Sequence, residues 1–394
     1  MLRNIKVLDL TIYLAGPYCT WILGTLGAEI IKIERPEGGD PSRSLGPFIN
    51  EESTYFASVN RNKRSLALDL KSPKGRKILE RLIAEADILV ENLRPGVRQS
   101  LGLCDARLHA INPRLIPLSI SGYGTTSPHA DQPAFDIIAQ AMSGMMHMTG
   151  QPDGPSNLTG ASIGDITAGL FGTINILARL HARESNNTEL PSGAIDMSMT
   201  DCQMALLENA VSRTCNSNVP VGPIGTRHAS AAPFQVFETA DSPMVIAVVG
   251  NLVWQKFCRV LGKAGKALVN DPRYSEAQIR NQNVDLLCVD LSPILATRKR
   301  DDWIADLQAV NIPAAPVNTV AEALNSPHAE ARNLLQTVTS QTGNTFDLIK
   351  LPFGCDQNEP TAAPTLGQHS ESILLNAGYS VTEIAELRAE GVIT

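Results

Sequence analysis

The chain has 394 residues, of which 43% are hydrophobic and 19% charged, and its net charge is -7 at pH 7. This composition is typical of a folded protein, and the length exceeds what one core usually supports, so we expect two domains. The acidic balance argues against a nucleic-acid partner, which would need a basic face. No apolar run approaches the roughly 20 residues of a membrane span, so no membrane partner is expected.

Strand and helix patterns alternate in the first part of the chain. The predicted strands are Ile5–Leu10, Glu29–Ile33, Arg64–Leu70, Ile88–Val90 and Leu115–Ser121, and the predicted helices between them are Pro17–Leu26 and Ser72–Glu85. This alternation predicts a parallel α/β sheet, whose ligands bind beyond the carboxyl ends of the strands. Helical patterns then follow at Ile137–Met148, Ile166–Arg183 and Thr200–Asn209.

The composition changes after Asn216, where Asn216–Pro223 has the Asn, Pro and Gly content of a linker. Beyond it, Phe234–Thr239 and Met244–Val249 alternate like the strands of a hairpin. We expect a smaller α+β domain here and a second linker at Ala314–Val320. The predicted helices of this part are Val253–Leu261, Gln278–Leu295 and Arg300–Ala309, and Ser370–Glu390 is expected to supply a closing pair.

The cysteines and the start of the chain indicate the compartment. Seven cysteines are dispersed without a C-x-x-C pair, which is typical of reduced thiols. The strand-like start at Ile5–Leu10 leaves no room for a cleavable signal. The histidines lack metal-ligand spacing. We therefore expect a cytoplasmic protein without a metal site.

No standard nucleotide motif is present. The turn Leu14–Pro17 puts a glycine and a proline at a helix start, but the G-x-G-x-x-G spacing is missing. A nicotinamide-nucleotide domain is therefore disfavoured, and Glu34, which follows the second strand, is interpreted as a surface charge. Gly262–Lys266 also lacks the spacing of a P-loop.

Basic residues gather in or after the early strands. They are Lys32, Arg35, Lys63, Arg64, Lys71, Arg94 and Arg98. Together they would place several cations along one sheet edge, which suits a polyphosphate such as the ADP end of coenzyme A. Asn92 adds a side-chain amide suited to adenine or phosphate.

Asp165 stands between glycines at the mouth of the predicted helix that begins at Ile166. Asp is among the best N-cap residues, so a structural cap is one interpretation. The other is a nucleophile that forms a covalent acyl intermediate, kept ionised by the helix N-terminus. Asp136 opens another helix, and if the two carboxylates are close, their repulsion would raise one pKa.

These pieces resemble, in this order, the class III (formyl-CoA/carnitine-type, CaiB/BaiF) CoA-transferase family. The motifs are Val7–Thr11, Ala15–Pro17, Leu26–Glu34, Asn60–Ser65, Glu91–Gly96, Ser119–Gly124 and Leu366–His369. Each is weak alone, but the seven in register are specific, and they extend from Val7 to near the C-terminus. In that family the residue equivalent to Asp165 is the nucleophile.

The resemblance implies a fold and an assembly. We expect a Rossmann-like large CoA-binding domain from residues 1–215 and 321–394, and a small α+β domain with its linkers from 216–320. Two ring-shaped chains would interlock as a homodimer. CoA or acyl-CoA would be a substrate, with no permanently bound cofactor.

The resemblance also implies the site residues. CoA would contact the backbone at Leu14 and Ala15 and the side chains of Arg35, Leu68, Lys71 and Asn92; we add Arg94, Arg98 and Asp136 to this set. Asp165 would attack the acyl-CoA thioester and then carry CoA as an aspartyl thioester, with oxyanions stabilised by backbone N–H groups near the glycines. Arg227 or His228 would bind the acceptor carboxylate, the alternative for Arg227 being a structural ion pair.

Rival functions remain. An α-methylacyl-CoA racemase shares the fold but resembles the motif Gly-His-Asp-Ile, whereas this chain has Phe135 before Asp136, so one of the two required acid/base groups is missing. A non-catalytic CoA-binding protein is the other alternative. Leu14 replaces the Gln of the oxalate-using branch, which argues against a formyl-CoA:oxalate pair. Gly225–Ala229 resembles the branches that use succinate, glutarate-like or citramalate-like acids, so a small dicarboxylate such as succinate is expected as acceptor.

Overall fold

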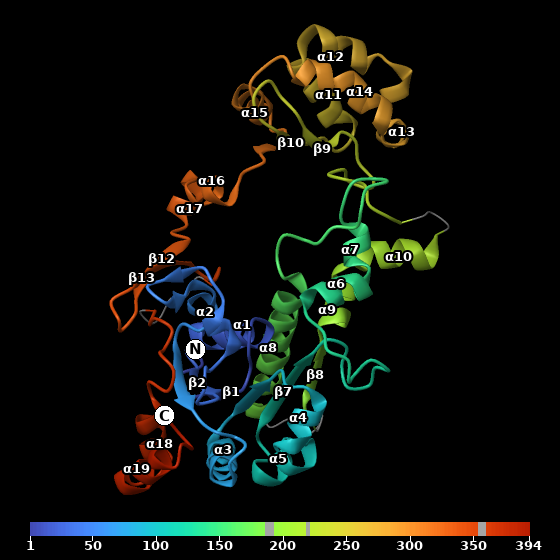
Figure 1. Cartoon of the computed structure of the whole chain (residues 1–394). Helices are drawn as coiled ribbons and strands as arrows, with labels where there is room; N and C mark the ends of the chain where they lie inside the picture. Colours follow the sequence, from blue (N-terminus) through green and yellow to red (C-terminus); the bar gives the residue numbers. More distant parts are fainter. Residues whose placement is uncertain (186–192, 218–220, 354–359) are drawn as a thin grey trace. The chain divides into compact units, whose positions relative to one another are not determined.

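A computed structural model describes residues 1–185, 193–217, 221–353 and 360–394. The chain divides into two compact units (Figure 1). The first contains Met1–Met146, Leu158–Val219 and Arg332–Thr394, and the second contains His147–Asn157 and Pro220–Ala331. Residues 147–157 and 321–331 thus fall in the second unit, whereas we expected them in the large domain. The predicted linker Asn216–Pro223 lies partly outside the described residues.

A six-stranded parallel sheet forms the centre of the first unit (Figure 1). Its strands are β1 (Lys6–Asp9), β2 (Glu29–Glu34), β5 (Lys63–Ala67), β6 (Ile88–Glu91), β7 (Ile116–Ser121) and β8 (Ile195–Ser198). Their order across the sheet is β5-β2-β1-β6-β7-β8, which is the Rossmann-type order. The predicted parallel α/β sheet is therefore present, with its switch point between β1 and β6.

Helices cover both faces of this sheet because successive strand residues point to opposite sides. On β1, Leu8 packs into a core with α3 and the C-terminal helices, whereas Val7 packs into a second core with α1 and α8. The helices of this unit are α1 (Ala15–Thr25), α2 (Thr54–Val59), α3 (Pro73–Glu85), α4 (Pro95–Ser100), α5 (Asp105–Ile111), α6 (Asp136–Ser143), α7 (Met145–Met148, across the boundary), α8 (Ile163–Glu184), α9 (Met199–Leu206), α10 (Glu208–Asn216), α18 (Ser370–Asn376) and α19 (Val381–Ala389).

Close helix packing explains two glycines of α8. A Cβ on Gly169 would lie 2.9 Å from the Ala15 carbonyl oxygen, and one on Gly172 would lie 2.8 Å from Leu118. The helix can therefore approach α1 and β7 at short range. By length and composition α8 could cross a membrane, contrary to our expectation of no such segment. Its residues Ala168, Ile176 and Leu180 nevertheless lie in the protein core.

The second unit contains a three-stranded antiparallel sheet of β9 (Phe234–Phe237), β10 (Met244–Ala247) and β11 (Ala314–Pro316). The predicted hairpin is thus correct, but part of the predicted linker Ala314–Val320 is a strand. The helices are α11 (Asn251–Val260), α12 (Gly262–Val269), α13 (Ala277–Gln282), α14 (Val284–Leu295), α15 (Arg300–Ala309), α16 (Val320–Leu324) and α17 (Pro327–Ala331). The hydrophobic core of the second unit includes Trp254, Phe257 and Trp303.

The differences from the predicted elements have local causes. The pattern Ile137–Met148 is interrupted at Gly144, whose φ of +88° ends α6. The strand β8, the helix α12 and two hairpins were missed. These hairpins are β3 (Phe48–Ile49) with β4 (Glu52–Ser53), and β12 (Leu335–Thr339) with β13 (Thr345–Ile349).

Candidate active site

The loop after β1 and the loop after β6 meet at the switch point of the sheet. The Asn92 side chain accepts a hydrogen bond from the Ile12 backbone N–H at 2.9 Å and donates to the Ile12 carbonyl at 2.8 Å. Its amide is therefore engaged by the β1–α1 loop, whose conformation it fixes. The neighbouring Tyr13 is held at φ +65°, a region that few non-glycine residues adopt.

Gly16 allows this loop to turn sharply into α1. A Cβ at this position would lie 2.2 Å from the Thr11 side chain, so only glycine fits. Leu14 and Ala15 lie at the helix start, where the first N–H groups have no partner within the helix. The backbone at Leu14 and Ala15 therefore offers N–H groups to an anion, and its contact with CoA stays a prediction.

Several of the basic residues do not form the expected row of exposed cations. Lys63 and Lys32 are fully buried and pair with Asp9 and Asp40, each at 2.9 Å. Arg64 pairs with Glu29, and Arg98 pairs with Glu91 and Asp105. The charges of these four residues are therefore already compensated by carboxylates. Exposed guanidinium and ammonium groups remain at Arg35, Lys71 and Arg94.

Glu34 is also not a surface charge. It is only 5% exposed, and its two oxygens accept hydrogen bonds from Arg43 at 2.7 and 2.8 Å. Ser65 donates a third bond at 2.6 Å. The interpretation failed because Arg43, nine residues later, folds back onto this carboxylate. Leu68 lies in the core at 1% exposure, so its predicted CoA contact stays a prediction.

Asp165 lies in the first turn of α8, not at its cap. The N-cap is Ser162 and the helix begins at Ile163, so the capping interpretation is wrong. Asp136, the first residue of α6, instead reaches the start of α8: its Oδ1 accepts a hydrogen bond from the Gly164 N–H at 2.7 Å. Two carboxylates thus meet at one helix N-terminus.

Burial and the charge of Asp136 together raise the pKa of Asp165 to about 7. The expectation that the helix N-terminus keeps Asp165 ionised is therefore wrong, whereas the expected effect of like-charge repulsion is present. No salt bridge joins Asp165 to a Lys, Arg or His in the described ranges. A carboxylate with a pKa near neutrality is a stronger nucleophile than an ordinary one and is still available at physiological pH.

Aromatic side chains near Asp165 were not predicted. Burial, and then the charges of Asp165 and Asp40, raise the pKa of Tyr55 to about 12, so its hydroxyl remains a hydrogen-bond donor. Tyr13 contacts Phe135 edge-on, with ring centroids 6.0 Å apart. Tyr55 lies in α2, far from Asp165 in the sequence, and no local motif identifies it.

Two buried glutamines surround the start of α8. Gln140 is 1% exposed and donates to Asp136 Oδ2 at 2.6 Å. Gln203 is fully buried, and its Nε2 lies 2.1 Å from where a Cβ on Gly164 would be. The spacing of Asp136 and Gln140, four residues apart in a helix, is a signal that the sequence does contain.

Arg227 and His228 lie in the second unit, whereas Asp165 lies in the first. Arg227 forms an ion pair with Asp285 at 2.6 Å, which is the structural alternative considered for it. His228 stacks on Phe234 with ring centroids 4.8 Å apart. Their contact with an acceptor acid stays a prediction.

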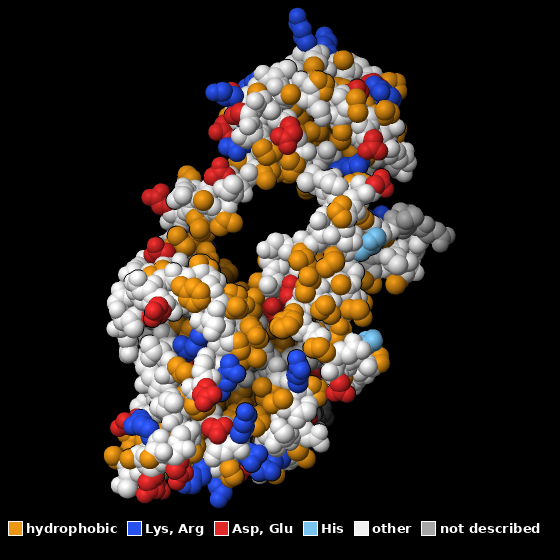
Figure 2. Space-filling model, viewed as in Figure 1, with side chains coloured by type: hydrophobic (Ala, Val, Ile, Leu, Met, Phe, Trp, Pro, Cys, Tyr) orange, Lys and Arg blue, Asp and Glu red, His pale blue; other side chains and the backbone are white. Residues whose placement is uncertain are grey.

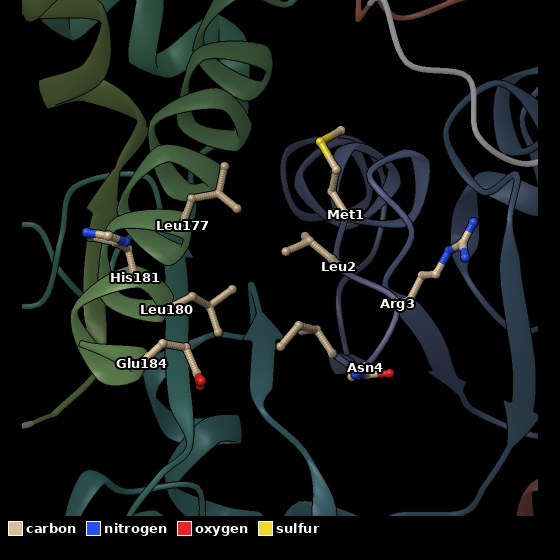
Figure 3. Close-up of a pocket in the computed structure, with 9 residues that line it drawn as sticks. Met1, Leu2, Arg3, Asn4, Leu177, Leu180, His181 and Glu184 are labelled. Atoms are coloured by element: carbon tan, nitrogen blue, oxygen red, sulfur yellow. The ribbon is translucent and has the colours of Figure 1, made fainter. Parts of the chain in front are cut away.

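A surface recess of about 690 Å³ lies at the other end of α8 (Figure 3). It is lined by Met1–Ile5 and by Leu177, Leu180, His181 and Glu184. Leu177 is twelve residues beyond Asp165, about 18 Å along the helix. The recess is therefore separate from the carboxylate pair. In the described ranges, no group of three His, Cys, Asp or Glu side chains could hold a metal ion.

Comparison with known proteins places the chain in a family. A Rossmann-type parallel sheet with helices on both faces, and a pair of carboxylates at the start of one of those helices, defines the class of α/β protein to which the chain belongs. Residues 2–370 match the family described as CoA-transferase family III. The chain belongs to this family and is a CoA-transferase, and enzymes of this class use CoA thioesters as substrates.

Curated relatives and solved structures agree with this assignment. The chain is 39% identical to an acetyl-CoA:oxalate CoA-transferase of Acetobacter aceti over 374 residues, covering 94% of each chain. It is 35% identical to a succinyl-CoA:glutarate CoA-transferase of Mus musculus, covering 100% of this chain and 90% of the relative. A CaiB/BaiF family protein from Brucella suis superposes with a TM-score of 0.83 at 32% identity, covering 95% of this chain and 99% of that one.

Proposed function

We propose that the chain transfers CoA from an acyl-CoA donor to a small carboxylic acid through a covalent intermediate on Asp165. The carrying observation is the meeting of Asp165 and Asp136 at the start of α8, with no cation bridged to Asp165 among the described residues. A carboxylate kept only for structure would be stabilised by a partner of opposite charge. This one is made more basic by its surroundings, as a nucleophile requires.

The transfer proceeds in balanced steps. An Asp165 oxygen attacks the thioester carbonyl, the carbon–sulfur bond breaks, and CoA leaves as a thiolate, so that a mixed anhydride of Asp165 and the donor acid remains. The thiolate attacks the Asp165 carbonyl carbon and releases the donor acid, which leaves an aspartyl-CoA thioester. The acceptor carboxylate attacks that thioester and expels the thiolate, which then attacks the acceptor's carbonyl carbon and regenerates Asp165. The covalent intermediates thus divide one difficult exchange into several easier steps.

Oxyanions form in every step and need donors. We expected backbone N–H groups near the glycines to serve, but the N–H of one of them, Gly164, already donates to Asp136. The hydroxyl of Tyr55 fits this role better, because burial and the charges of Asp165 and Asp40 keep it protonated. It interacts electrostatically with Asp165 and comes from a different element.

We place the CoA moiety at the carboxyl ends of β1 and β6. The helix start at Leu14 and Ala15 offers N–H groups there, and Asn92 fixes the loop. Arg35, Lys71 and Arg94 supply exposed positive charge for phosphates. Arg98 contributes less, since Glu91 and Asp105 already neutralise it.

For the acceptor we propose a small dicarboxylate. The relatives are named for oxalate, glutarate and mesaconate as CoA acceptors or partners, so oxalate joins succinate among the candidates despite Leu14. Arg227 or His228 would bind the acid's second carboxylate. Release of Arg227 from Asp285 is then required.

A homodimer in the cytoplasm is the proposed working form. Exposed apolar side chains gather on α6 and α8, where Figure 2 shows a hydrophobic face. They include Ile137, Ile138 and Met142 of α6 and Leu170, Phe171 and Ile174 of α8, each 37–60% exposed. A patch of this kind on one helix pair indicates an interface. Sedimentation equilibrium at micromolar concentration should give twice the chain mass.

Asp165→Asn tests the proposed function. It should abolish CoA transfer from succinyl-CoA or acetyl-CoA to the dicarboxylate panel, since an amide is a poor nucleophile. In the parent protein, acyl-CoA without acceptor should add the mass of CoA less one water to the peptide containing Asp165, and hydroxylamine should release the CoA and leave a hydroxamate at Asp165. Asp201→Asn is the matched control, because Asp201 occupies the same turn position in α9. Full transfer by Asp165→Asn would disprove the proposal.

A further inference from the structure

The start of α8 is held from both sides by side chains of α6. Asp136 holds the first turn through the Gly164 N–H at 2.7 Å. Gln140 holds the segment before the helix, because its Oε1 accepts a hydrogen bond from the Thr159 N–H at 3.0 Å. Its Nε2 donates to Asp136 Oδ2 at 2.6 Å. The two oxygens of Asp136 are thereby both occupied, and the carboxylate has one orientation.

We propose that Gln140 is a positioning residue for Asp165: its amide joins the Asp136 carboxylate to the Thr159 main chain and so fixes the first turn of α8. The inference rests on the proposed function, in which Asp165 is the nucleophile. Gln140 does not contact the reacting atoms. It acts through Asp136 and through the segment by which the chain returns from the second unit to the first.

A carboxamide is the side chain that this position requires. One end must donate to a carboxylate and the other must accept from a backbone N–H, at a burial of 99% where neither can turn to water instead. A carboxylate offers no donor when ionised, and an aliphatic chain offers neither. Without the Gln140 amide, the Thr159 N–H and one Asp136 oxygen would lose their hydrogen-bond partner, and both the Thr159 main chain and the Asp136 carboxylate could move.

Gln203 supports the same turn from α9. Its Oε1 accepts a hydrogen bond from Ser143 Oγ at 3.2 Å, at the end of α6, and its Nε2 lies against Gly164. A Cβ on Gly164 would also lie 3.0 Å from Asp136 Oδ1. The space around Gly164 is thus filled on one side by an amide and on the other by the Asp136 carboxylate. Small shifts of α6 would therefore be transmitted to Asp165.

Few titratable groups interact with Asp165 itself in the part of the chain that the structure describes. Asp136 from α6 and Tyr55 from α2 interact with Asp165. Cys19 from α1 and Cys202 from α9 are thiols whose pKa burial raises to about 12 and about 11, so both stay neutral. A change at Gln140 therefore alters the pH response of transfer mainly through Asp136.

Two variants and a control test the proposal. Gln140→Leu should lower kcat by about 10- to 100-fold, the loss expected for a reacting group misplaced by about 1 Å, while the KM for acyl-CoA changes less than about threefold. Gln140→Glu keeps the length and the acceptor for Thr159. When protonated it also donates to Asp136, but when ionised it repels it. Gln308→Met is the control, because the side-chain amide of Gln308 donates a hydrogen bond to the Ala314 carbonyl in the other unit.

The pH profile separates positioning from mere stability. Transfer by the parent protein should rise with pH as Asp165 ionises, whereas transfer by Gln140→Glu, relative to the parent, should fall as pH rises. Wild-type rates and profiles in both variants would overturn the proposal. So would a loss that follows the folded fraction, measured by circular dichroism, without that inversion. Asp165→Asn is assayed in parallel: if it stays active, the nucleophile itself is wrong, and if it alone is inactive, only the role of Gln140 is wrong.

Discussion

Two groups of buried acids near the carboxyl ends of the strands are built in opposite ways. Asp9, Glu34 and Asp40 each have a cationic partner, with Lys63, Arg43 and Lys32 at 2.7–2.9 Å. Asp165 has another carboxylate as its charged neighbour. The first arrangement holds charges still and stabilises the loops around the switch point. The second raises the basicity of a carboxylate, and the contrast separates the paired acids from the one that we propose as the nucleophile.

The pKa of Asp9 and that of Asp165 show the same contrast. Burial alone would raise both, but attraction to Lys63 and Lys32 and hydrogen bonds from two threonines hold the pKa of Asp9 well below its usual range. At Asp165, burial and Asp136 act in the same direction. Burial is thus common to the two sites, and the sign of the neighbouring charge decides the outcome.

Lys63→Met should have the largest effect, because it leaves the Asp9 carboxylate buried without its closest cation. We expect the free energy of unfolding, measured in urea at pH 7, to fall by about 3–5 kcal/mol. The double variant Asp9→Asn/Lys63→Met should recover part of this loss. Since the pKa of Asp9 is lowered in the folded state, its stabilisation is present above about pH 4 and disappears in more acidic solution. A loss of unfolding free energy below about 1 kcal/mol would show that the Lys63–Asp9 ion pair does not stabilise the fold.

Asp165→Asn should have the opposite effect on stability. The folded protein keeps a proton on Asp165 up to about pH 7, so this group's contribution to stability is present below about pH 4 and is lost as pH rises through 7. The amide carries no charge to bury, so the variant should be more stable at pH 8 by about 1–3 kcal/mol. This is less than the whole pKa shift corresponds to, because solvent screens part of the buried charge. Urea unfolding at pH 8 and pH 4 checks this: the gain should shrink at pH 4, and an equal gain at both would contradict it.

The sequence predicted the framework of the site better than its chemistry. Alternating strands and helices located the sheet, and the turn at Gly16 and the carboxylate at Asp165 were identified from local patterns. The role of Lys63 was not, because a lysine at a strand end looks the same whether it faces solvent or a buried aspartate 54 residues away. Tyr55 and Gln203 were missed for the same reason, since both reach the site through tertiary packing. The capping interpretation of Asp165 failed by three positions, because the helix begins at Ile163, three residues before the apolar pattern begins at Ile166.

Asp136→Asn addresses the contrast directly by removing the like charge and keeping the side chain's shape. Its oxygen can still accept from the Gly164 N–H, so α8 should begin at the same residue. Its amide NH2 then faces the Gln140 Nε2 donor, so that hydrogen bond is lost and kcat should also fall, as in Gln140→Leu. Without that repulsion, the pKa of Asp165 should fall, and the acidic limb of the pH profile of kcat/KM should move down by about one pH unit, equivalent to about 1.4 kcal/mol. Burial remains, so the limb should stay above the range of an exposed aspartate. An unmoved limb would mean that burial alone sets the basicity of Asp165, and that Asp136 acts only as an anchor for the helix.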